Sequence, residues 1–128
     1  MNTNKNLVYN QHRENEEWVS KLSFYKDEIA IMQNRIQEVV SANTSKEILS
    51  RAEHFQNQLI VQKNNIDMIK HGVNESERSL ENNILHNPVS ADHRKTEDHS
   101  KERKDVTSFE NNFTDLRREL NTFLSKTL

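Results

Sequence analysis

Apolar residues recur at alternating steps of four and three residues through long stretches of this chain. We call each such series a seam. The three seams are Trp18, Leu22, Tyr25, Ile29, Met32, Ile36 and Val39; Ile48, Ala52, Phe55, Leu59, Ile66, Ile69 and Val73, with Gln62 in the middle; and Val106, Phe109, Phe113, Leu116, Leu120 and Phe123. This spacing keeps a narrow apolar stripe on one side of a helix. The sequence therefore predicts an all-α chain of three long, coiled-coil-like helices.

The composition agrees with helices that each bury only one stripe. Apolar residues make up 32% of the chain and charged residues 30%, and the mean hydropathy is -1.01. Disordered chains share such values, but they lack sustained apolar periodicity. A chain of 128 residues is the size of one domain, so we expect a single domain over 1–128.

Helix ends must be set largely by capping residues, because the chain holds one glycine and one proline. Thr44 and Glu47 have the spacing of a capping box, and Asn43 suits the left-handed conformation that ends many helices. Pro88 cannot continue a helix, and Asn87 or Ser90 could cap the next one. We expect helices at about 8–42, 45–86 and 91–127.

Connections this short make consecutive helices antiparallel neighbours, which gives an up-down-up three-helix bundle. The seams then meet in shared layers: Trp18 with Ile69 and Val106, Leu22 with Ile66 and Phe109, Ile29 with Leu59 and Leu116, Met32 with Phe55 and Leu120, and Ile36 with Ala52 and Phe123. One layer is mixed and contains Tyr25, Gln62 and Phe113. Because a buried amide is costly without a partner, we predict that Gln62 bonds to the Tyr25 hydroxyl or to water.

Five histidines, at positions 12, 71, 86, 93 and 99, gather toward one predicted end of the bundle. A divalent metal site there is the alternative function, and its candidate ligands are His99, Glu102, His12 and Glu16, which form two pairs at one-turn spacing. However, only His99 and Glu102 continue the spacing of a seam, that of the third seam before Val106, and no Glu-x-x-His motif occurs. We favour a partly solvated polar end without a cofactor.

Motifs of catalysis are missing, so we expect neither an enzyme nor a small-molecule substrate. A single glycine rules out a glycine-rich phosphate loop, and no nucleophile elbow or metalloprotease motif occurs. The formal net charge of -2 comes from well-mixed charges, so we expect no nucleic-acid partner. No segment reaches the length of an apolar membrane span, and residues 1–8 lack the apolar run of a signal peptide. With no cysteine in the chain, we expect a cytoplasmic protein that does not contact membranes.

Some apolar residues lie outside the seams, and these are the candidates for binding. They are Val19, Phe24, Ile31 and Val40; Leu49, Ile60, Val61 and Met68; and Leu124 and Leu128. Part of this set should widen the core. Any that stay exposed together would suit a fourth helix or a second copy of the chain, so a dimer is plausible.

The runs 18–29 and 53–58 resemble segments of small bacterial helical proteins of unknown function. The architecture is also similar to that of a spectrin-like repeat, with a Trp on the first seam. These resemblances imply a helical bundle and supply no functional residue. We therefore expect a non-enzymatic structural or protein-interaction module, an adaptor or a self-associating bundle.

Overall fold

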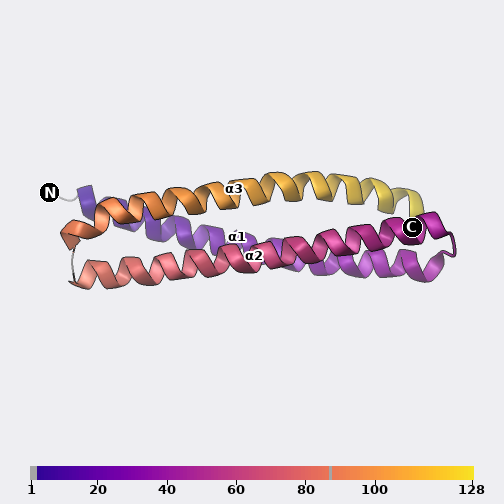
Figure 1. The fold of residues 1–128 in the computed structure, drawn as a ribbon, viewed down its shortest axis with the longest axis horizontal. Coiled ribbons are helices and arrows are strands. Elements are labelled where there is room, and N and C mark those ends of the chain that lie inside the picture. Colours follow the sequence, from indigo (N-terminus) through magenta and orange to yellow (C-terminus); the bar gives the residue numbers. More distant parts are fainter. Residues whose placement is uncertain (1–2, 87) are drawn as a thin grey trace.

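The fold is an antiparallel bundle of three long helices, as predicted. The computed structural model describes the backbone of residues 3–86 and 88–128 and the side chains at 7–82 and 99–128. Its elements are α1 (Thr3–Ala42), α2 (Lys46–His86) and α3 (Pro88–Thr127), and the described backbone contains no strand. Figure 1 shows three rods side by side, with α1 and α3 parallel and α2 running the opposite way.

Two helices begin earlier than the sequence indicated. α1 starts at Thr3 instead of near residue 8, and α3 starts at Pro88 instead of near residue 91. Proline fits the first helical position because the N–H that it lacks has no partner there in any helix. Pro88 is thus the first residue of α3, so Ser90 lies inside the helix and is not its cap, and Asn87 lies outside the described residues.

The connection between α1 and α2 uses other caps than those predicted. Ser45 rather than Thr44 precedes α2, and its Oγ accepts the backbone N–H of Ile48 at 3.4 Å. No non-glycine residue has a positive φ in the described backbone, so the prediction that Asn43 adopts the left-handed conformation is wrong. Instead, Asn43 Nδ2 donates to the Val39 carbonyl at 2.8 Å and satisfies one of the free carbonyls at the end of α1.

The three seams form the core. Seventeen buried apolar residues make one cluster: Trp18, Leu22, Ile29, Met32, Ile36, Val39, Ala52, Phe55, Leu59, Ile66, Val73, Val106, Phe109, Phe113, Leu116, Leu120 and Phe123. Tyr25, Ile48 and Ile69 are partly buried against it. The rings of Tyr25 and Phe113, assigned to one layer, lie 5.2 Å apart between centroids. At about 1.5–3 kcal/mol for each large side chain, this burial is the main source of stability.

Polar contacts between the helices are distributed unevenly. Among the described side chains, every hydrogen bond or ion pair between two helices involves α1. Lys26 of α1 forms an ion pair with Asp67 of α2, with Nζ 2.8 Å from Oδ1. Glu28 of α1 forms one with Arg117 of α3, with Oε2 2.7 Å from Nε. Between described side chains, no hydrogen bond or ion pair joins α2 to α3. These two helices share ring contacts instead: the Phe123 ring lies 5.2 Å from Phe55 and 5.3 Å from the Arg51 guanidinium.

No helix in the described part of the chain is both long enough and apolar enough to cross a membrane.

We predict that Leu59→Ala lowers the free energy of unfolding by about 2–5 kcal/mol, because Leu59 is fully buried and the vacated space cannot collapse completely. Its neighbour Ile60 is about half exposed and provides the matched control, since Ile60→Ala should change stability by less than about 1 kcal/mol. Urea unfolding followed by circular dichroism measures both. Equal losses would mean that the seam does not form the core at this point.

Candidate functional site

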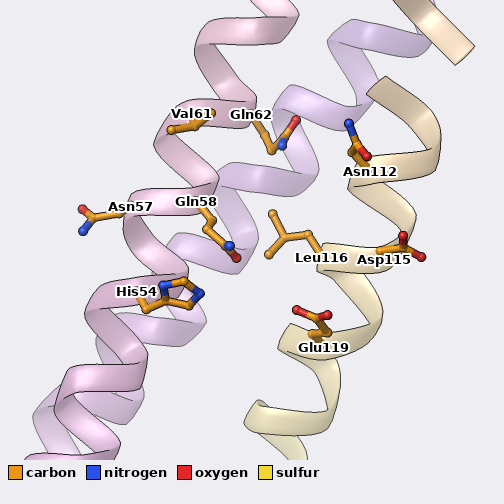
Figure 2. A pocket seen from close by; sticks show the side chains of 9 residues that line it. All are labelled: His54, Asn57, Gln58, Val61, Gln62, Asn112, Asp115, Leu116 and Glu119. Carbon is orange, nitrogen blue, oxygen red and sulfur yellow. The ribbon is translucent and has the colours of Figure 1, made fainter. Parts of the chain in front are cut away.

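Two adjacent pockets lie in a row between α2 and α3. The first has a volume of about 400 Å³ and is drawn in Figure 2. In this view Gln58 and Gln62 of α2 point toward α3, Leu116 and Asn112 of α3 point toward α2, and Asn57 and Asp115 point outward. The second has a volume of about 360 Å³. Gln62 and Asn112 line both pockets, so the two form one groove, which we call the α2–α3 groove.

Gln62 creates part of this groove by interrupting the second seam. Its Oε1 is buried and has no hydrogen-bond partner among the described residues, and the same holds for Oε1 of Gln58, one turn away. The predicted bond from Gln62 to Tyr25 is wrong, because the Tyr25 hydroxyl donates to Glu110 Oε2 at 2.8 Å instead. The other predicted partner of Gln62, a water molecule, stays a prediction. Burial and, second, this bond to Glu110 raise the pKa of Tyr25 above its usual value.

The walls of the groove differ in character. The α2 wall includes Val61 and Met68, both well exposed. The α3 wall carries more acids than bases, and its acids include Asp105, Asp115 and Glu119. A ligand in this groove would meet an apolar rim on one side and carboxylates on the other.

The histidine-bearing end holds α1 against both other helices. The Nδ1–H of His12 donates to Glu77 Oε2 of α2 at 2.7 Å, and its Nε2 contacts Glu16. The hydrogen bond to Glu77, more than the nearby charges, raises the pKa of His12. The bond to Glu77 ties α1 to α2, and the two carboxylates beside the ring favour its protonated form.

His99 makes the corresponding contact between α3 and α1. Its buried ring stacks on Trp18 with the centroids 4.7 Å apart, and its Nε2 contacts Glu14. Glu14 also receives the Arg103 guanidinium at 2.7 Å. The hydrogen bond from Arg103 lowers the pKa of Glu14 most, and the bond from His99 lowers it further. Burial raises it but by less, so the pKa of Glu14 lies below its usual value.

The structure brings the four candidate metal ligands together only in part. His12 contacts Glu16, whereas His99 pairs with Glu14 and buried Glu102 lines the second pocket. Within the described residues, no group of three or more histidine, aspartate or glutamate side chains could hold a metal ion. The side chains of His86 and His93 lie outside the described set. The metal-binding alternative stays a prediction.

Glu14 and Glu77, the main partners of the two histidines, were not among the predicted site residues. Continued by one step of three residues beyond Trp18 and Val73, the seams reach Asn15 and Ser76, and the two glutamates flank these positions, Glu14 before Asn15 and Glu77 after Ser76. Flanking positions are where helices in coiled coils exchange ion pairs, so this was the signal that could have identified them.

No family model, curated protein or solved structure matches this chain. The functional reading therefore depends on the geometry of the bundle alone.

We predict that Gln62→Leu raises the free energy of unfolding by about 1 kcal/mol, because it removes a buried, unpartnered amide oxygen and introduces the residue type that the seam favours. Asn57→Leu, an exposed change on the same helix, is the control and should have little effect. Urea unfolding compares the variants. A loss of stability in Gln62→Leu would show that the amide is satisfied in solution.

We predict that His12→Gln destabilises the bundle in a manner that depends on pH. Because the folded pKa of His12 is raised, its contribution is fully present below the unfolded pKa of about 6.5 and disappears as pH rises through the folded value. The stability difference from the wild type should therefore be largest near pH 6 and shrink with rising pH. His54→Gln, at a position with no ion pair among the described residues, should show no such trend. A difference for His12→Gln that is independent of pH would contradict the His12–Glu77 contact.

Proposed function

We propose that this chain is a non-enzymatic helical module that works by protein–protein contact, as an adaptor or through self-association. The observation that carries the proposal is a set of large apolar side chains that the core leaves in solvent. Their exposed fractions are 65% for Phe24, 59% for Ile31, 48% for Ile60, 53% for Val61 and 72% for Met68.

Four of these residues form two pairs with heptad spacing. Phe24 and Ile31 are seven residues apart on α1, and Val61 and Met68 are seven apart on α2. Each pair thus lies along one line on its helix, about 10 Å apart. Partner helices are commonly held by apolar anchors at such intervals. Val19 and Leu124, by contrast, pack against the core, as expected for residues that widen a seam.

The residues of the α2–α3 groove also favour a binding role. They supply amides, carboxylates and apolar side chains, which are the groups that contacts between helices use. A protein partner is consistent with the size of the groove, which extends over both pockets along the bundle.

We predict that replacing the four exposed residues abolishes association without unfolding the bundle. The test compares the wild type with Phe24→Ser plus Ile31→Ser, with Val61→Ser plus Met68→Ser, and with the quadruple variant. Sedimentation of the purified chain measures self-association, and affinity capture from the native cell measures binding to other proteins. At least one double variant should lose the association while its helical circular dichroism and melting temperature stay close to the wild type. Association that survives in the quadruple variant, or a wild type that remains a monomer and captures nothing, would refute the proposal.

A further inference from the structure

The two walls of the α2–α3 groove point to one kind of occupant. Building on the function proposed above, we propose that this groove binds an amphipathic helix of a partner protein that carries lysine or arginine along one flank. The partner helix would lie as a fourth rod beside α2 and α3.

The α2–α3 groove is the side of the bundle that the chain itself does not close with polar contacts. Ion pairs cross from α1 to α3 at Lys21–Glu110 and Arg117–Glu28, and from α1 to α2 at Lys26–Asp67. Between described side chains, none crosses from α2 to α3. An occupant of this groove would therefore not have to break existing ion pairs between helices.

The lining residues repeat at the interval that another helix matches. On α2 the lining includes His54, Val61 and Met68, and on α3 it includes Asp105, Asn112 and Glu119, each series in steps of seven. Residues in such steps form straight lines along helices that pack together in a bundle. From His54 to Met68 the groove is about 21 Å long, and to Gly72 about 27 Å, which corresponds to about five turns of a docked helix.

The groove offers both an apolar rim and unfulfilled hydrogen-bonding capacity. Val61 and Met68 provide exposed apolar surface on the α2 rim. On the floor, the Oε1 atoms of Gln58 and Gln62 are buried without a partner among the described residues. A rotation of either amide would present its oxygen to a donor on an occupant, which favours side chains rich in N–H groups.

The charged residues of the groove indicate which charge the partner helix carries. The charged residues of α3 that line the two pockets are four acids and one base: Glu102, Asp105, Asp115, Glu119 and Lys101. Asp105 pairs with Lys101, and Asp115 pairs with Arg118 just outside the pockets, so with both bases counted this wall keeps an excess of two acids. The lining residues of α2 include no lysine, arginine, aspartate or glutamate. A helix whose apolar face covers Val61 and Met68 would place its flank against the α3 carboxylates, so that flank should be basic.

The test uses two synthetic helical peptides of about 21 residues that share one apolar heptad stripe. One peptide carries lysine and arginine on its polar face, and the other carries glutamate. Fluorescence anisotropy with the full chain should show that the basic peptide binds at least roughly tenfold more tightly at low salt, and that this preference falls at about 0.5 M salt.

Two double variants locate the binding in the groove. Asp115→Lys with Glu119→Lys should abolish or reverse the preference for the basic peptide, whereas Asp27→Lys with Glu38→Lys, the same charge change on the exposed surface of α1, should leave it intact. Val61→Ser with Met68→Ser should weaken binding roughly tenfold. Phe24→Ser with Ile31→Ser is the matched apolar control and should not weaken it. Circular dichroism confirms that each variant is folded.

The proposal is overturned if neither peptide binds, if both bind equally, or if the α1 variants weaken binding as much as the groove variants. A chain that dimerises through Val61 and Met68 would also overturn it, because a second copy would then occupy the groove. The function proposed above survives each of these results if the variants of exposed apolar residues still lose association with a native partner or with another copy. The proposed function itself fails if the wild-type chain neither self-associates nor captures a partner.

Discussion

The common heptad phase of the three seams is the constraint on which the rest of the structure depends. Because each seam is only two residues wide per heptad, the helices bury their apolar side chains only when the seams converge on a single axis. That convergence determines which residues flank the core and which face solvent. Trp18, Leu22 and Ile29 on α1 and their counterparts on α2 and α3 are buried in one continuous cluster as a result. The polar contacts are placed by this packing and add to it.

α1 occupies a special place within this arrangement. One of its flanks carries Glu14, Lys21 and Glu28 toward α3, and the other carries His12 and Lys26 toward α2, so its contacts hold both neighbours. α2 and α3 instead present amides to each other, together with acids of α3 of which Asp105 and Asp115 pair with bases on α3 itself. Charged pairs at partly exposed positions add only modest stability, but they specify which helix faces meet. The bundle is therefore closed on two sides and less complete on the third.

The positions that break the rules of bundle packing gather on or near that third side. Gln62 has an amide at a seam position, where an apolar residue would pack better. Val61 and Met68 have apolar side chains at solvent-exposed positions, where polar residues are usual. Departures of this kind are expected where a surface serves binding, because stability alone would have favoured the opposite residues. Phe24 and Ile31 on α1 are a second departure, on a different part of the surface.

The sequence by itself determined the fold class, the three helices, their antiparallel order and almost every core residue, because these depend on local periodicity and on short connections. It also indicated which apolar residues were in excess. It did not determine the caps at Asn43 and Ser45, since several neighbouring side chains could serve, nor the partners of Tyr25, His12 and His99. Those depend on the rotation of each helix about its axis and on the reach of side chains from neighbouring helices. Only the tertiary structure decided that Glu110 and not Gln62 receives the Tyr25 hydroxyl, and that the open groove lies between α2 and α3.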